Sequence, residues 1–345
     1  MNKNFLYTLL DSMSVSGHEI PLQKKVIAEM TPYAHEIRTD YTGNVICVLN
    51  PDAPFKVLLT GHIDEIGLIV TQIQDDGFLR VTYAGGIHPY QYPGHQVVVH
   101  GAKGPVYGTV IANQNTDKKD LKAKELYIDI GARDEAEARI YVREGDPAHF
   151  HSYHQEMLGG FLSARAVDDR GCAFIILEAL KRARELGCQI GVYAATTVGE
   201  ETTMRGAHWA CSAVEPNLAI AVDVTFATDY PGTEPECTGK VQLGKGPVLC
   251  HSSIVNTKTN DLLYACAKAH SIPIQEEVAV GRTGTDADKM HFSDKGYPTA
   301  LVSLPLRYMH SPSEVCHTDD IQNAIELLAR FLCTINGETD LDPFH

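Results

Sequence analysis

Acidic and histidine side chains stand where several predicted strands end, and these residue types bind divalent metal ions. His62 and Asp64 directly follow one apolar run, and the pair Glu200-Glu201 directly follows another. Open parallel sheets bind ligands just beyond the carboxyl ends of their strands. We therefore expect these side chains to meet at one edge of a sheet. The full set is His62, Asp64, Asp168, Glu200, Glu201, Asp223 and His310.

Gathering four carboxylates at an apolar edge is unfavourable unless cations are present. Asp168, Glu200, Glu201 and Asp223 would be partly buried there and would repel one another. A pair of divalent ions removes that cost. Imidazole and carboxylate ligands without a thiolate suit Zn²⁺, and also Co²⁺ or Mn²⁺. The charge of two such ions balances three ligand carboxylates and one hydroxide, which leaves one carboxylate free to act as a base.

The spacing of His62 and Asp64 has its own chemical logic. A metal-binding histidine usually donates its other ring N–H to a carboxylate, which fixes the tautomer. Asp64 stands two residues further on in an extended segment and can turn back to accept that bond. We therefore expect Asp64 to orient His62. A second group, His149, His151 and His154, has no evident carboxylate partner, so we interpret it as a polar loop.

The elements that must position these residues alternate between helix and strand. Two continuous apolar runs near the start of the chain, 44–50 and 56–60, are typical of buried parallel strands. The alternation of helices and strands resumes after residue 160, and the pattern predicts a doubly wound α/β domain with a mostly parallel sheet. In that part we predict helices over 166–186, 202–212, 262–269 and 319–336, and strands over 191–197, 218–224 and 298–304.

The middle of the chain has a different pattern. From 68 to 160, short alternating runs are broken by Gly and Pro, which predicts an inserted small all-β barrel or sandwich. The charged segment 118–124 is predicted as a solvated turn within it. The expected domains are therefore an α/β catalytic domain, 1–67 and 161–345, and the β insertion, 68–160.

Composition excludes several function classes. The chain has 345 residues and a formal net charge of −15, which argues against binding duplex nucleic acid or an anionic membrane. Apolar runs such as 172–177 are far shorter than the ~18 residues of a membrane span. The nine scattered cysteines form no Cys-x-x-Cys motif. We expect a reducing, cytoplasmic compartment and no cysteine-based zinc site.

Five segments contain the candidate site residues: 61–67, 166–171, 199–201, 219–225 and 307–312. Together they resemble the M42 family of metallo-aminopeptidases, which includes glutamyl and tetrahedral (TET) aminopeptidases. They are in order along nearly the whole chain, as are further matches at 16–19, 127–132, 243–247 and 284–287. At 202–206 the chain has Thr-Thr-Met-Arg-Gly, where the family more often has Val-Gly-Leu-Arg-Gly.

The resemblance implies two metal ions per subunit, with Zn or Co expected. His62, Asp168 and Asp223 would hold one ion. Asp168, Glu201 and His310 would hold the other, so that Asp168 bridges the two. The fold implied is a zinc-peptidase-like α/β domain, in which the bridging aspartate typically precedes a cis peptide bond.

The resemblance also implies a mechanism and an assembly. Glu200 would be the general base that takes a proton from a metal-bridging water, and Asp64 would orient His62. The substrates would be peptides, cleaved at their N-terminal residue. The insertion 68–160 would be a dimerisation domain, and such dimers commonly build tetrahedral dodecamers.

Alternative functions make different demands on the chain. A di-zinc carboxypeptidase or N-deacylase needs a cationic anchor for a substrate carboxylate, for which Arg170 and Arg307 are candidates. A glutamyl preference needs a positive wall, for which Arg282, Arg307 and Lys289 are available. An inactive assembly protein should lack a ligand or Glu200, and all are present. A glycosidase needs two opposed carboxylic acids on an open cleft, which a metal-type cluster does not provide.

Overall fold

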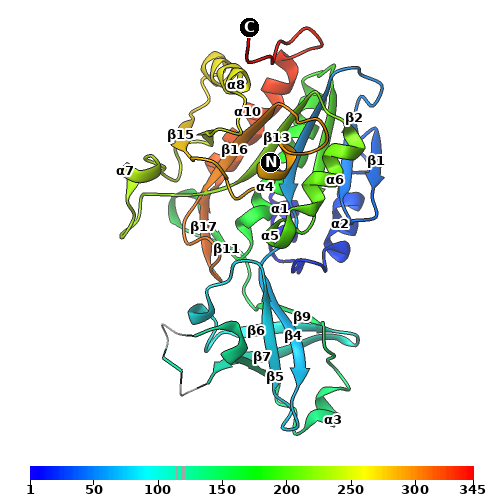
Figure 1. Ribbon diagram of the computed structural model, residues 1–345, viewed down its shortest axis with the longest axis vertical. Helices are drawn as coiled ribbons and strands as arrows, with labels where there is room; N and C mark the ends of the chain where they lie inside the picture. Colours follow the sequence, from blue (N-terminus) through cyan, green and yellow to red (C-terminus); the bar gives the residue numbers. More distant parts are fainter. Residues whose placement is uncertain (114–115, 118–120) are drawn as a thin grey trace.

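The chain folds into an α/β part and a small β-barrel that lies beneath it (Figure 1). This computed structural model describes residues 1–113, 116–117 and 121–345. Residues 118–120 of the expected turn at 118–124 lie outside the described residues. The mixed α/β fold with an all-β barrel confirms the predicted fold class.

Eight strands of the described chain form one sheet, whose centre is parallel. β3 pairs in parallel with both β12 and β13, and β13 pairs in parallel with β16. Along the sheet the order is β1 (Glu36–Thr39), β2 (Val45–Leu49), β12 (Gly191–Thr197), β3 (Lys56–His62), β13 (Leu218–Phe226), β16 (Thr299–Leu306), β14 (Val248–His251) and β15 (Gln275–Val278).

The prediction for the run 44–50 was wrong in its direction. β2 is fully buried, as expected, but it pairs antiparallel with β1 and with β12. A short loop connects β1 to β2, and such a connection joins antiparallel neighbours, whereas parallel neighbours need a long crossover. Burial on both faces gives the same continuous apolar run in either direction, so the run could not distinguish them.

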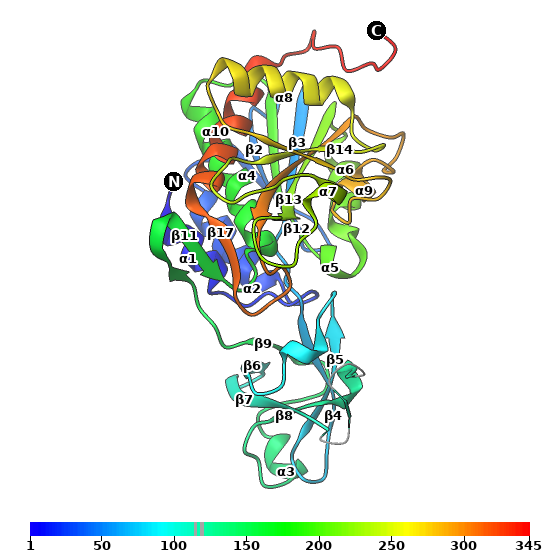
Figure 2. The ribbon, with the colours of Figure 1, turned by 90° about the vertical axis from the view of Figure 1, so that its left-hand side faces the viewer.

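Helices cover both faces of the sheet because alternate strand residues point to opposite sides. On β13, Ile220 and Val222 belong to one apolar cluster, and Ala219 and Ala221 belong to the other. Figure 2 looks onto the side where α8 and α10 lie. The first cluster includes residues of α1 (Lys3–Leu10), α2 (Ile20–Met30), α4 (Val167–Glu185), α8 (Thr257–Ala269) and α10 (Thr318–Thr334), and the second includes α6 (Arg205–Val214) and α9 (Ala287–Met290).

The helix predicted over 202–212 is divided. Met204 has a positive φ of 55°, which ends α5 (Glu200–Thr203) and separates it from α6. A left-handed residue cannot continue a right-handed helix. The short α5 therefore carries Glu200 and Glu201 on a separate turn.

The inserted segment forms a closed barrel around its own apolar core. Leu68, Val70, Leu79 and Val81 point into this core, which agrees with the alternating pattern of the sequence. In the described residues the barrel order is β4 (Gly67–Ile73), β5 (Leu79–Ala84), β8 (Leu126–Asp129), β7 (Gly104–Ala112), β6 (Gln96–Gly101) and β9 (Pro147–Phe150). The short helix α3 (Glu135–Ala138) lies between β8 and β9 in sequence.

A small three-stranded sheet leads the chain back from the barrel. It consists of β10 (Gln155–Glu156), β11 (Phe161–Ala164) and β17 (Glu314–His317). A further short helix, α7 (Pro235–Thr238), follows β13. No helix in the described part of the chain combines the length and apolar character that crossing a bilayer requires. All nine cysteines are free thiols, as expected.

Candidate metal centre

The seven predicted site residues meet at the carboxyl edge of the parallel strands. His62 is the last residue of β3 and pairs with Thr197, the last residue of β12. The strand that carries Asp223 was expected to end at Val224, but β13 continues to Phe226. The buried stretch is longer than the sequence indicated because β16 continues beside β13 as far as Leu306.

Asp168 lies between the two histidines. Its Oδ1 is 3.2 Å from Nε2 of His62, and its Oδ2 is 3.2 Å from Nε2 of His310. Nε2 of His62 is also 3.7 Å from Oε2 of Glu200, and Nε2 of His310 is 3.8 Å from Oε2 of Glu201. The peptide bond Asp168–Asp169 is cis, as expected from the resemblance.

Two groups of potential ligands share the Asp168 carboxylate. Within each group, one ligand atom from every residue lies within 4.8 Å of the others. One group is His62, Asp168 and Asp223, and the other is Asp168, Glu201 and His310; these are the two such groups among the described residues. The structure thus brings together the five expected ligands, in the two triplets that the resemblance implies. Their role as ligands stays a prediction.

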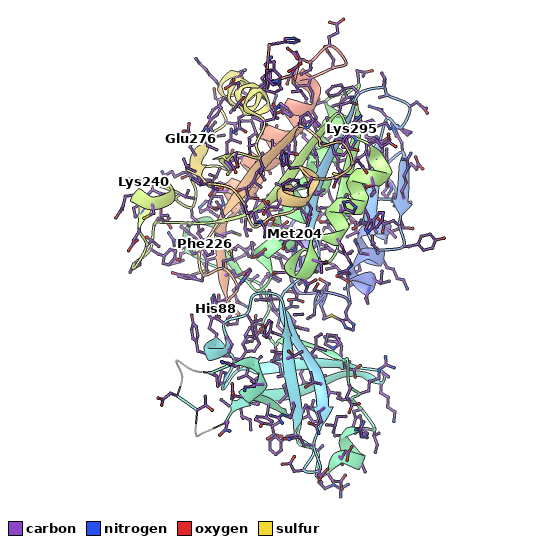
Figure 3. All side chains as sticks on the ribbon, in the orientation of Figure 1. His88, Met204, Phe226, Lys240, Glu276 and Lys295 are labelled. Carbon is purple, nitrogen blue, oxygen red and sulfur yellow. The ribbon has the colours of Figure 1, made fainter. Side chains whose placement is uncertain are left out.

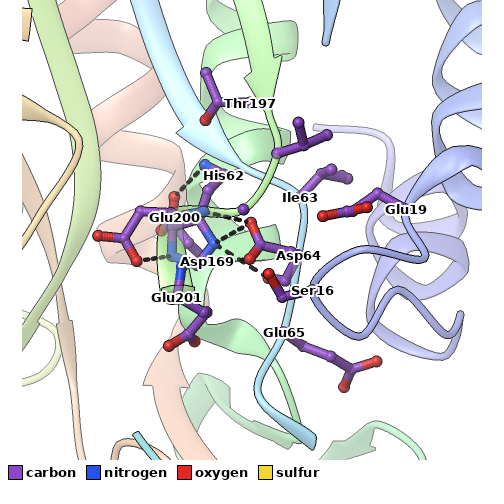
Figure 4. Close-up of polar contacts among 12 residues, drawn as sticks. Ser16, Glu19, His62, Ile63, Asp64, Glu65, Asp169, Thr197, Glu200 and Glu201 are labelled. Atoms are coloured by element: carbon purple, nitrogen blue, oxygen red, sulfur yellow. Dashed lines mark hydrogen bonds and ion pairs between the residues drawn. The ribbon is translucent and has the colours of Figure 1, made fainter. Parts of the chain in front are cut away.

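Asp64 is fully buried and holds two parts of the site together (Figure 4). Its carboxylate accepts the backbone N–H groups of Glu200, at 3.1 Å, and Glu201, at 3.3 Å. Nδ1 of His62 donates to the backbone carbonyl of Asp64, at 3.1 Å, and lies 3.5 Å from the carboxylate. These contacts place the proton on Nδ1 and leave Nε2 as the potential metal ligand.

The pKa values of the buried carboxylates are raised, because their ionised forms are unfavourable together in the absence of cations. Burial raises the pKa of Glu200 well above its usual value, although His62 opposes the shift. Burial and the Asp168 charge likewise raise the pKa of Glu201. Burial raises the pKa of Asp223 to about 8. Such shifts arise when charges are desolvated near charges of the same sign.

Two oxygens of the cluster have no partner among the described residues. Oε1 of Glu200 and Oε1 of Glu201 are buried and accept no hydrogen bond. Unpaired buried carboxylate oxygens are costly, and divalent cations bound beside them offset that cost. The donor set, two imidazoles and a cluster of carboxylates without a thiolate, is one that Zn²⁺, Co²⁺ or Mn²⁺ accepts. The residues present therefore fit a pair of divalent ions.

Three residues that the sequence analysis did not assign support the ligands. Oδ2 of Asp169 accepts the backbone N–H of His62 at 2.9 Å. The buried carboxylate of Glu314 accepts the backbone N–H groups of Asp168, at 3.1 Å, and His310, at 2.8 Å. Nδ1 of His310 donates to the carbonyl of Gly86 at 2.7 Å. Asp169 and Glu314 stand close to ligands in sequence, which was a usable signal, whereas Gly86 belongs to the barrel.

A buried ion cluster lies behind the site. The Glu65 carboxylate pairs with both Arg165 and Arg170, and their guanidinium groups also donate to the carbonyl of Ser12. Arginine pairing outweighs burial and lowers the pKa of Glu65 to about 2. Arg170 is fully buried and therefore cannot serve as a substrate anchor.

The second candidate anchor, Arg307, is paired with Asp229. Its Nε and Nη2 donate to the two carboxylate oxygens of Asp229, each at 2.7 Å. Both cations proposed from the sequence as anchors for a substrate carboxylate are thus already paired.

The second histidine group is dispersed. Nε2 of His149 lies 2.9 Å from Nε2 of His100, and His151 contacts Tyr153. His154 has the carboxylate partner that the sequence did not reveal, Asp11, at 2.8 Å. These histidines belong to neither of the ligand groups found among the described residues.

The fold is shared with solved aminopeptidases. A TET aminopeptidase from a marine sediment archaeon of the Thaumarchaeota superposes with a TM-score of 0.92 and 30% identity, over 97% of each chain. The Pyrococcus horikoshii TET1 peptidase, which can assemble into a tetrahedron or a large octahedral shell, has a TM-score of 0.87 and 30% identity, over 96% of this chain and 99% of its own. The fold is thus that of an aminopeptidase-type α/β protein.

The sequence comparisons identify the family. Residues 43–327 match the M42 glutamyl aminopeptidase family. The lysyl aminopeptidase of Pyrococcus furiosus is 34% identical over 337 residues, covering 94% of each chain. The chain belongs to the M42 peptidase family, as its sequence motifs predicted.

Proposed function

We propose that this protein is a di-metal aminopeptidase that removes N-terminal residues from peptides. Membership of the M42 family supports the aminopeptidase class. The observation that carries the proposal is the pair of carboxylate–imidazole groups that share Asp168. A carboxylate placed between two imidazoles, 3.2 Å from each Nε2, has the arrangement of a bridging ligand.

Each group of residues would hold one divalent ion, Zn²⁺ or Co²⁺. His62 and Asp223 would hold one ion, Glu201 and His310 the other, and Asp168 both. When bound, the ions polarise the scissile carbonyl and lower the pKa of the attacking water. The protein itself holds these side chains in place before substrate binds. The buried carboxylates of Asp64, Asp169 and Glu314 do this by accepting backbone N–H groups of the site residues.

Glu200 is the candidate general base. Its backbone N–H is held by Asp64, and its Oε2 lies 3.7 Å from Nε2 of His62, so the carboxylate faces the centre. Oε1 has no partner among the described residues and is available to accept a proton from water. Glu200 would then pass that proton to the leaving amine, so each turnover restores the carboxylate.

The acidic character of the site favours a substrate with a free α-amine. Burial and the nearby Asp223, Asp286 and Asp64 together raise the pKa of Glu200. A protonated or metal-seeking amine is attracted there, whereas a substrate carboxylate is repelled. With Arg170 buried and Arg307 paired to Asp229, the carboxypeptidase and N-deacylase alternatives are not favoured.

Hydrolysis of aminoacyl-p-nitroanilides tests the proposal. A panel with free and N-acetylated amines is assayed with Zn²⁺ or Co²⁺, and again after chelation. We expect cleavage of the free-amine substrates only, lost on chelation and restored by metal. Cleavage of acetylated substrates would indicate a deacylase, and no cleavage by folded, metal-loaded protein would indicate an assembly protein.

We further propose that the barrel is the dimerisation domain and that dimers assemble into a tetrahedral dodecamer in the cytoplasm. Tyr83, Tyr107 and Tyr141 expose large aromatic surfaces on the barrel, and Tyr107 is 60% exposed. Exposed aromatic side chains are enriched at protein interfaces. Light scattering should give a mass of twelve subunits, and Tyr107→Asp should reduce it; a monomer at micromolar concentration would contradict the proposal.

A further inference from the structure

A loop of the barrel passes beside the metal centre. After β5 the chain runs through Gly85 and Gly86 to His88 and the short helix η1 (Pro89–Gln91). Figure 3 labels His88 where the barrel meets the α/β part. The His88 ring centroid lies 6.5 Å from that of His310, so the loop passes directly beside the candidate ligands.

Gly86 contacts one of those ligands. Its carbonyl accepts a hydrogen bond from Nδ1 of His310 at 2.7 Å. This bond places the ring proton on Nδ1 and leaves Nε2 facing Asp168 at 3.2 Å. His310 has a positive φ of 62°, a conformation that non-glycine residues hold only when their surroundings fix it. The Gly86 carbonyl and the Glu314 carboxylate, which accepts the His310 N–H, supply those contacts.

Gly85 lies beside a second ligand of the same group, Glu201. Its φ is +83°, and a Cβ atom there would lie 2.5 Å from Cγ2 of Ile66 and 3.1 Å from Oε2 of Glu201. A Cβ on Gly86 would lie 3.2 Å from Cε1 of His310. A Cβ on Gly85 would thus force Ile66 to move and press against Glu201, and a Cβ on Gly86 would press against His310 at a distance tighter than nearly all real Cβ contacts.

We propose that Gly85 and Gly86 are positioning residues of the Asp168–Glu201–His310 site, so that the barrel helps to hold one of the two metals. The inference rests on the proposed di-metal function. His62 and Asp223, which complete the other site, are not among the nearest described atoms to a Cβ on either glycine. Loss of the Gly85–Gly86 packing should therefore lower the affinity for one metal ion and leave the affinity for the other nearly unchanged. Groups that support metal ligands in this way typically contribute about 10- to 100-fold in metal affinity.

Metal titration of the Gly85→Ala variant tests this. Metal-free protein is titrated with Zn²⁺ in a calorimeter and with Co²⁺ by visible absorption, which reports binding without activity. We expect the affinity of one site to fall by about 10- to 100-fold and that of the other to change by less than about threefold. Two sites of wild-type affinity in this variant would overturn the inference.

Gly94→Ala is the matched control. Gly94 lies in the same barrel with φ +88°, so an alanine there carries a similar backbone strain, but no described atom lies within 4 Å of its Cβ. It should bind both metals as the wild type does. A selective loss in Gly94→Ala equal to that in Gly85→Ala would mean that barrel strain, not contact with the ligands, is responsible, and would overturn the inference.

Gly86→Ala keeps the inference testable if Gly85→Ala does not fold. Its φ is not positive, so alanine there lacks the added strain, and among the described residues its Cβ would approach only the His310 ring. It should also weaken one metal selectively, and wild-type binding would decide against the inference. Wild-type protein that binds no divalent metal would instead refute the proposed function, so the two failures are distinguishable.

Discussion

The carboxylate of Asp64 accepts the backbone N–H of Glu200 at 3.1 Å, across a gap of 136 residues in sequence. The same carboxylate lies 3.5 Å from Nδ1 of His62. One buried side chain therefore fixes both the candidate base and a candidate ligand. These hydrogen bonds account for the complete burial of the Asp64 side chain.

Replacing Glu200 by Gln should abolish most of the activity. An amide has the same shape but cannot accept the proton of the attacking water, so kcat should fall by at least ~10²-fold. Metal content and thermal unfolding should stay near those of the wild type. Steady-state kinetics on the preferred p-nitroanilide provide the measurement, with the exposed Glu236→Gln as control. Turnover at the wild-type rate would remove Glu200 from its role.

Asp64→Asn should weaken metal binding without unfolding the protein. The amide oxygen can still accept the Glu200 N–H, but the negative charge beside His62 is lost. Removal of such a partner typically costs about 10- to 100-fold in metal affinity or activity. Competition with a chromogenic chelator measures the change. An affinity equal to that of the wild type would show that Asp64 does not tune His62.

His62→Ala and His310→Ala should each lower the metal-to-protein ratio. Each variant removes one imidazole from one of the two ligand groups. His88→Ala is the matched control, because its ring lies 6.5 Å from His310 but belongs to neither group among the described residues. Elemental analysis after dialysis measures the ratio. If the ratio does not change in either ligand variant, the assignment is wrong.

Chelation should lower the unfolding temperature reversibly. Without cations the buried carboxylates are desolvated and repel one another, which destabilises the folded state. Burial and like charge raise the pKa values of Glu200 and Glu201 for the same reason. A ligand that binds only the folded state stabilises it by about 2.7 kcal/mol at a hundredfold excess over its Kd. Calorimetry with and without Zn²⁺ measures this. An unfolding temperature that does not depend on metal would contradict the proposal that this cluster binds divalent ions.

Acid should destabilise the fold in part through His149. Burial, with the nearby Arg165 charge, lowers the pKa of His149 to about 3, against an ordinary value of 6.5, despite the opposing charge of Glu65. Between those pH values the unfolded chain binds a proton that the folded chain does not. Stability is therefore full above about pH 6.5 and decreases as the pH falls.

Urea unfolding at pH 7.5 and pH 5 measures this contribution. His149→Gln carries no titrating group, so its stability should decline less between the two pH values than that of the wild type. Equal declines in both proteins would show that other groups, such as the carboxylates of the metal centre, account for the whole effect.

Much of the architecture was present in the local pattern of the sequence. The strand 191–197 and the helices near 166–186 and 319–336 were predicted almost to the residue, because long apolar periodicity is a local property. The sequence did not indicate the antiparallel direction of β2 or the break at Met204. Burial on both faces hides strand direction, and a left-handed residue other than glycine leaves no compositional signal.

The identity of the candidate ligands was also contained in the sequence, since residue type and position after a strand are read from the chain itself. The groups that hold those ligands were decided only by the tertiary structure. Gly86 and His310 are 224 residues apart, and their hydrogen bond exists because the barrel folds back against the edge of the sheet. Such contacts depend on the packing of two separately formed units, so no local pattern of residues can specify them.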